Sequence, residues 1–212
     1  MSSLAFSIVG ARPEPYGASP MLALRLRIEE TSGLCVHAIA LRVQVQIEPQ
    51  RRRYGETETP RLLDLFGEPA RYGQTLRPLL WTHLSAMALA FEEATELDLF
   101  LPCSYDFEVA ANKYLSALED GEVPLILFFS GTVLAEGKQG VAAELVSWES
   151  EARYRLPVRL WRAEMEAFFP GTTWLRLSRD AFGELARFKS ENGLPTWDAA
   201  VTRLCAAAKV ER

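Results

Sequence analysis

Two runs of alternating apolar and polar residues in the first quarter of the chain constrain its fold most. Apolar side chains occupy every second position of residues 22–28, and again of residues 37–47 beginning at His37. A two-residue period places one face of a β-strand in a core and the other in water. The short polar turn at residues 31–33 joins the runs, which predicts a β-hairpin. A shorter strand is predicted before them at residues 6–9.

The middle of the chain predicts more strands and one helix. Residues 49–78 are rich in Pro and Gly and read as a long loop with one helical turn at residues 61–66. Residues 79–91 fit neither period cleanly; we favour a strand that forms a second hairpin with the alternating residues 97–101. Ser104 is expected to cap a helix that ends before Gly121. A buried strand over residues 123–135 and a returning strand over 141–148 complete this part.

The C-terminal part carries helix signals. An amphipathic helix is predicted after Pro157, and Ser178 and Thr196 are expected to cap two further helices. The fold class is therefore α+β: an antiparallel β-sheet or sandwich with one internal helix and a C-terminal helical segment packed on it. We expect a single domain over residues 1–212, β-rich with one helix over 1–156 and helical over 157–212.

Bulk composition excludes several classes of protein. The 212 residues are 49% apolar and 24% charged, with a net charge of −5, as in ordinary globular proteins. No apolar run approaches the roughly 18 residues of a membrane span. Neither half of the chain is basic, which argues against a nucleic-acid partner. The N-terminus lacks a secretory signal and the three cysteines are widely spaced, so a cytoplasmic location is expected.

Chemistry-bearing motifs are scarce. No metal-binding His or Cys spacing, phosphate-binding glycine loop or nucleophile elbow occurs, so no catalytic residue, metal or cofactor is predicted. Cys103 precedes the predicted helix cap, where a thiol pKa would be lowered; we favour the other interpretation, a small buried residue at a strand-to-helix turn. His37 lies on the apolar side of its predicted strand and suits a hydrogen-bonded core position better than a ligand. His83 falls in the ambiguous segment.

The one local concentration of charge is Arg51, Arg52 and Arg53, followed by Tyr54. Arginine forks bind phosphate and carboxylate groups in a bidentate manner. These four residues are therefore candidates for contact with a partner, and a solvated loop is the alternative. Five tryptophans favour a protein-binding surface slightly, because aromatic residues are enriched at interfaces.

Several short segments resemble an uncharacterised bacterial family. They are LPCSYDFEVAANKYL (101–115), DGEVPL (120–125), FSGTV (129–133), LPV (156–158), WLRL (174–177) and LPTWD (194–198). The N-terminal strands are also similar, so the resemblance covers most of the chain. The resemblance implies that the genes of this family commonly lie beside those of [NiFe]-hydrogenases and their maturation factors. It implies no activity and no catalytic residue.

Three functions remain open. The first, which we favour, is a non-enzymatic accessory or assembly protein that binds a protein partner, such as a [NiFe]-hydrogenase subunit or maturation factor. The second is a chaperone-like binder of unfolded chains, which requires an exposed apolar groove and a symmetric oligomer. The third is an enzyme with an unfamiliar site near Cys103 or His37, which requires a pocket with titratable groups.

Overall fold

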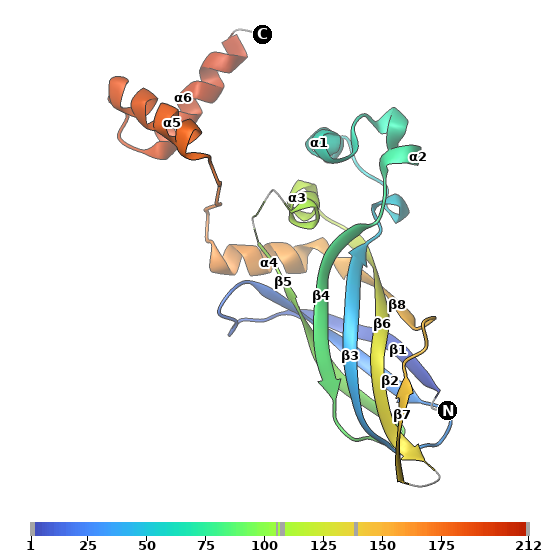
Figure 1. Ribbon diagram of the computed structural model, residues 1–212. Coiled ribbons are helices and arrows are strands. Elements are labelled where there is room, and N and C mark those ends of the chain that lie inside the picture. Colours follow the sequence, from blue (N-terminus) through green and yellow to red (C-terminus); the bar gives the residue numbers. More distant parts are fainter. Residues whose placement is uncertain (1–2, 105, 107–108, 138–139, 211–212) are drawn as a thin grey trace. The chain divides into compact units, whose positions relative to one another are not determined.

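The computed structural model consists of two compact units, residues 1–173 and residues 174–212 (Figure 1). It describes residues 3–104, 106, 109–137 and 140–210. The first unit holds every strand and helices α1–α4, and the second holds α5 and α6. The predicted α+β class is confirmed. The expectation of a single domain stays a prediction.

The described residues of the first unit form eight strands, arranged in two antiparallel sheets. The first sheet has the order β1-β2-β5, and the second has the order β4-β3-β6-β7, with β8 also paired to β6. The strands are β1 Leu4–Pro13, β2 Met21–Glu30, β3 Val36–Ile47, β4 Leu79–Ala88, β5 Ala94–Pro102, β6 Glu122–Gly137, β7 Gly140–Leu145 and β8 Glu151–Pro157. Phe6 of β1 stacks on Phe129 of β6 with 4.4 Å between ring centres, so the two sheets meet face to face.

Helices and turns fill the connections. The helices are α1 Leu63–Phe66, α2 Tyr72–Thr75, α3 Ala110–Ala117, α4 Val158–Phe168, α5 Arg179–Glu191 and α6 Trp197–Val210, with 3-10 turns at Pro49–Arg51, Thr59–Leu62 and Pro69–Arg71. Within the described part of the chain, no helix combines the length and apolarity needed to cross a bilayer.

The alternating runs form the core, as predicted. Leu22, Leu24, Leu26 and Ile28 of β2 are completely buried, and the alternate residues of β3 from Ile39 to Ile47 are at most 2% exposed. Full burial of one such aliphatic side chain contributes about 1.5–3 kcal/mol. The strands at residues 6–9, 79–91 and 123–135 are confirmed as parts of β1, β4 and β6. The sequence analysis does not anticipate β8.

Both predicted hairpins are wrong. β2 pairs with β1 and β5, whereas β3 pairs with β4 and β6, so residues 31–35 pass from one sheet to the other. The link from β4 to β5 likewise changes sheet, since β5 pairs only with β2. In-plane pairing satisfies backbone hydrogen bonds but leaves an apolar face uncovered. Stacking two sheets buries that face, and alternation alone does not distinguish the two arrangements.

The internal helix is shorter than predicted. It begins at Ala110, not at Ser104. The Ser104 hydroxyl oxygen accepts hydrogen bonds from the backbone N–H of Asp106 at 3.1 Å and from the side-chain amide of Asn112 at 2.7 Å. Ser104 therefore stabilises a local turn, a known competitor of helix capping. Residues 105, 107 and 108 of the predicted helix lie outside the described residues.

Helix α4 packs on the first sheet and confirms the helix predicted after Pro157. Its buried side is formed by Val158, Trp161, Glu164 and Met165. The Glu164 carboxylate accepts a hydrogen bond from the backbone N–H of Met21 at 2.8 Å. The buried carboxylate therefore satisfies the first amide of β2, a group that burial would otherwise leave without a partner.

In the second unit the predicted caps are confirmed. The Ser178 hydroxyl accepts from the backbone N–H of Ala181 at 3.2 Å, and the Thr196 hydroxyl accepts from Ala199 at 3.1 Å. Gly193 has a φ of 60° and ends the first helix in the left-handed conformation that glycine favours. Local sequence therefore fixes both helix starts and the turn between them.

A buried carboxylate holds the crossover between the sheets. Glu30 accepts hydrogen bonds from the backbone N–H groups of Ser3 (2.9 Å), Ser32 (2.9 Å) and Leu34 (3.0 Å), and from the Ser32 hydroxyl. Burial alone raises the pKa of Glu30, but these donors outweigh burial and lower it to about 2. The charged form is therefore the one that the fold stabilises.

The Glu30→Gln variant is expected to lower the free energy of unfolding by about 2 kcal/mol at pH 7, the usual value for hydrogen bonds to a charged group. The native pKa lies below the ordinary value of 4.5, so this stabilisation is present above pH 4.5 and is lost as the pH falls towards 2. Urea unfolding at pH 7 and pH 2.5 measures it. Glu29→Gln, at a half-exposed neighbour, is the control. An equal loss for Glu30→Gln at both pH values would contradict this account.

Candidate functional site

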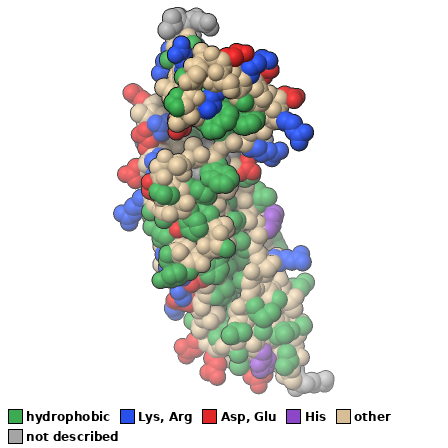
Figure 2. Space-filling view, turned by 90° about the vertical axis from the view of Figure 1, so that its left-hand side faces the viewer, with side chains coloured by type: hydrophobic (Ala, Val, Ile, Leu, Met, Phe, Trp, Pro, Cys, Tyr) green, Lys and Arg blue, Asp and Glu red, His purple; other side chains and the backbone are tan. Residues whose placement is uncertain are grey.

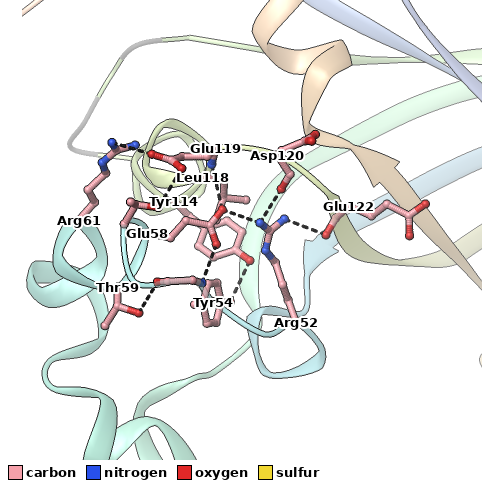
Figure 3. Close-up of polar contacts among 12 residues, drawn as sticks. Arg52, Tyr54, Glu58, Thr59, Arg61, Tyr114, Leu118, Glu119, Asp120 and Glu122 are labelled. Atoms are coloured by element: carbon pink, nitrogen blue, oxygen red, sulfur yellow. Dashed lines mark hydrogen bonds and ion pairs between the residues drawn. The ribbon is translucent and has the colours of Figure 1, made fainter.

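Arg52 lies in an internal network at one end of the second sheet (Figure 3). Its guanidinium donates to the Glu58 carboxylate at 2.6 Å and to the backbone carbonyls of Asp120 (2.6 Å) and Glu122 (3.0 Å). The Arg52 and Glu58 side chains are only 10% and 7% exposed. Glu58 also accepts from the backbone N–H of Glu119 at 2.9 Å. The pair therefore ties the long β3–β4 connection to the segment between α3 and β6.

Tyr54 belongs to the same network. Its hydroxyl donates to the carbonyl of Pro49 at 2.7 Å and lies 2.9 Å from the Tyr114 hydroxyl. Tyr72 and Phe66 pack edge-on against these two rings. Burial, followed by the effect of Tyr114, raises the pKa of Tyr54, and burial raises the pKa of Tyr114 to about 12. Both phenols are therefore neutral near pH 7 and act as structural hydrogen-bonding groups.

The four residues proposed for partner contact thus separate into two pairs. Arg52 and Tyr54 have polar groups engaged inside the chain, whereas Arg51 and Arg53 are exposed. Arg51 contacts Glu48 at 3.4 Å. Contact of Arg51 and Arg53 with a partner stays a prediction. The sequence analysis missed Glu58. Nothing in the local pattern indicates that an acidic residue six positions after Arg52 is its buried ion-pair partner.

The histidines and Cys103 occupy separate environments. The prediction that His37 lies on the apolar side is wrong: Val36 is buried and His37 is exposed. A register irregularity between Val36 and Ala38 in the pairing with β6 shifts the alternation by one residue. His83 is exposed and pairs with Gln44, seven residues along β3 from His37, which separates the histidines by roughly 20 Å.

Cys103 is a buried thiol rather than an activated one. Burial, with a smaller effect of Glu164, raises its pKa to about 12. A nucleophilic thiol requires the opposite shift. Among the residues that the structure describes, no group of three or more His, Cys, Asp and Glu side chains is placed to hold a metal ion.

The outer face of the first sheet is a ladder of ion pairs. Asp98 of β5 pairs with Arg12 at 2.9 Å and with Arg25 at 3.0 Å. Arg27 pairs with Glu29 at 2.8 Å and with Glu96 at 3.5 Å. These side chains are partly exposed, so the ladder contributes little stability but makes this face charged and well hydrated.

The part of the second sheet's outer face that β4, β3, β6 and β7 form is different. The strand register aligns Met87 of β4, Ala40 of β3, Thr132 of β6 and Leu145 of β7 in one row across four strands. Met87 is 65% exposed and Leu145 is 82% exposed. The neighbouring rows are Ala38, Leu134 and Ala143 on one side and Ser85, Arg42 and Ser130 on the other. We call these ten residues the sheet-two face; Arg42 is the one charged residue among them.

A shallow depression of about 620 Å³ lies in the middle of this face. It is lined mainly by small side chains, with Met87 and Arg42 at its edges. Figure 2 views a neighbouring side of the molecule and shows hydrophobic side chains exposed over its lower part, with acidic side chains gathered along one edge. A broad, open and weakly charged depression suits a protein surface better than a small polar ligand, which needs an enclosed pocket with converging polar groups.

Comparisons with solved structures give only distant likenesses. The CARDB domain of a Pyrococcus furiosus protein, solved with di-metal ions, has a TM-score of 0.27 and 11% identity over 73% of this chain and 86% of its own. Beta-glucosidase 3B from Thermotoga neapolitana has a TM-score of 0.27 and 14% identity, and the match covers 73% of this chain but 17% of the enzyme. Beta-glucosidase from Kluyveromyces marxianus matches at 8% identity over 15% of its length. Likenesses at this TM-score carry no inference about activity.

The family comparison covers the complete chain. No curated protein matches it. The model of DUF6084, a family of unknown function, matches residues 1–212. The resemblance to an uncharacterised family is thereby confirmed, and it brings no activity and no site residue with it. The chain, with its two-sheet unit and its C-terminal helices, belongs to the DUF6084 family of unknown function.

Proposed function

We propose that this protein is a non-enzymatic accessory protein that binds another protein through the sheet-two face. The observation that carries this proposal is the contrast between its two sheets. The outer face of the first sheet is covered by paired charges, whereas the part of the second sheet formed by β4, β3, β6 and β7 exposes Met87, Leu134 and Leu145 around small residues. The ion pairs on the outer side of the second sheet lie beside this part, on β8, where Arg153 pairs with Glu151. Water-exposed sheet faces are ordinarily polar. A face with exposed apolar side chains and a single charged residue is typical of an interaction site.

The shape of the face supports the same proposal. Small side chains at its centre, such as Ala40 and Ser130, let a partner's side chains approach the backbone closely. Met87 at the edge is flexible and polarizable, as in adaptable binding surfaces. Arg42 supplies one charged group that fixes orientation. From the family resemblance, the expected partner is a [NiFe]-hydrogenase subunit or maturation factor.

The test compares the wild-type chain with a Met87→Asp/Leu145→Asp variant. Both side chains are largely exposed, so the change in the free energy of unfolding is expected to stay below about 0.5 kcal/mol for each. Binding to purified hydrogenase subunits and maturation factors is measured by titration calorimetry. The variant is expected to bind the partner at least about 100-fold more weakly. The complex would bury the two introduced Asp carboxylates without counter-ions.

Val9→Asp is the matched control, since Val9 is a half-exposed apolar residue on β1 of the other sheet. It is expected to bind the partner with unchanged affinity. Equal binding by the wild type and the double variant would remove the sheet-two face from the proposal. Absence of binding to every purified hydrogenase component would remove that partner class.

A further inference from the structure

The second unit carries an apolar stripe that the unit does not bury. On α6, Trp197, Val201 and Leu204 are between 39% and 45% exposed. At 100° per residue these three and Ala208 fall within about 60° of one another around the helix. Among the residues of this helix whose exposure is described, 197–209, Ala200 alone is buried, and it lies to one side of the stripe. The stripe is therefore a continuous apolar line along α6 that faces outward.

The contacts inside the unit do not cover this stripe. The Phe182 ring of α5 lies 5.1 Å from the Trp197 ring, and the Lys189 ammonium lies 5.4 Å from its centre. These contacts join α5 to the first turn of α6 and leave Val201 and Leu204 open. Residues 174–212 form a unit below the roughly 40 residues at which chains usually fold without further support.

The charged residues beside the stripe indicate which kind of surface can pack on it. Asp198 and Lys209 lie eleven residues apart, close to the two ends of α6. Eleven residues are almost exactly three helical turns, so both side chains lie on the same flank of the stripe, away from Ala200. The flank is therefore acidic at its start and basic at its end. A surface with the same charges in the reverse order complements it, and an antiparallel copy of α6 is such a surface.

We propose that two copies of this chain associate through α6, with the two helices antiparallel about a two-fold axis. The apolar stripes then pack against each other, with the Leu204 side chains at the centre. Asp198 of each copy lies level with Lys209 of the other on the same flank, which gives two symmetric ion pairs. A parallel pair would place the two flanks on opposite sides and lose both. Two-fold association of helical hairpins is a common way to complete a small helical core.

Cys205 provides an internal probe of this arrangement. It is exposed and lies on the same flank as Asp198, one residue from the centre of the stripe. In the antiparallel pair the two Cys205 thiols lie on one side, about three residues apart along the helix axis, or roughly 5 Å. In a parallel pair they lie on opposite sides. Cys103 is buried and Cys35 is partly buried, so a short bis-maleimide is directed to Cys205.

The experiment is sedimentation velocity of the full chain over a range of concentrations. The wild type is expected to form a dimer, and Asp198→Lys and Lys209→Asp are each expected to raise its dissociation constant about tenfold, since each brings like charges together twice. The double reversal Asp198→Lys/Lys209→Asp restores the pairs and is expected to recover most of the loss. Circular dichroism verifies that helix content is retained.

Cross-linking keeps the proposal testable if a charge reversal unfolds α6. The wild type is expected to form a covalent dimer with the short bis-maleimide, and Cys205→Ser is expected to abolish it. A monomer at every concentration would overturn the proposal. So would a dimer that forms no Cys205 cross-link, or one whose dissociation constant is unchanged by both single reversals. None of these variants touches the sheet-two face, so this test and that of the proposed function fail separately.

Discussion

The Arg52→Ala variant is expected to lower the free energy of unfolding by about 3–5 kcal/mol, the loss typical of a buried ion pair broken from one side. The substitution leaves the Glu58 carboxylate, 7% exposed, without its counter-ion. It also removes the donors to the carbonyls of Asp120 and Glu122. Chemical denaturation measures the loss, and the connection between β3 and β4 is expected to become the most protease-sensitive part of the first unit.

Arg53→Ala is the matched control for this prediction. Arg53 is exposed beside Arg52, and its loss is expected to change stability by less than about 0.5 kcal/mol. In the double variant Arg52→Ala/Glu58→Gln, the second substitution removes the uncompensated charge. The double variant is therefore expected to lose less free energy of unfolding than the two single variants lose together. Equal effects of Arg52→Ala and Arg53→Ala would show that the network of Figure 3 does not stabilise the fold.

Gly131→Val is expected to destabilise the first unit by more than about 4 kcal/mol or to prevent folding. Gly131 of β6 has a φ of 147°, and a Cβ atom built there would lie 2.0 Å from the carbonyl oxygen of Ala40 on β3. The obstacle is backbone, so no side-chain rotation relieves it. Strain of this kind is among the few causes of very large mutational losses. Thermal unfolding of the soluble fraction measures the effect.

Gly10→Ala is the control for the glycine substitution. A Cβ atom at Gly10 meets nothing within 4 Å, and Gly10 is not among the glycines with a positive φ. Its replacement is expected to change stability by at most about 1 kcal/mol, in either direction. A Gly131→Val chain as stable as Gly10→Ala would mean that β3 and β6 can separate locally at no cost. The depression on the sheet-two face, which Gly131 lines, would then be deformable.

Local patterns were sufficient for most of the elements, but not for β8. Alternation identified β2 and β3, and hydroxyl caps identified the starts of α5 and α6, because these signals act within a few residues. The start of α3 was misplaced since Ser104 has two local uses, capping and turn formation, that sequence does not separate. The orientation of His37 was wrong because a single register irregularity inverts every side chain beyond it.

The candidate site required contacts between distant parts of the chain. Arg52 was recognisable as charged, but its burial depends on Glu58, Asp120 and Glu122 arriving around it. Likewise, the polar side of β3 was visible in the sequence. Its alignment with Met87 and Leu145 depends on the register of four strands.

The sequence by itself determined which residues are apolar, in what period, and where α5 and α6 begin, because these properties follow from neighbours along the chain. Only the tertiary structure decided that consecutive strands belong to different sheets, that Arg52 is buried in an internal network, and that four strands align to form the sheet-two face. The physical reason is that any apolar surface of matching shape can bury an apolar face. Which strand or helix packs on that face depends on the packing of the whole chain.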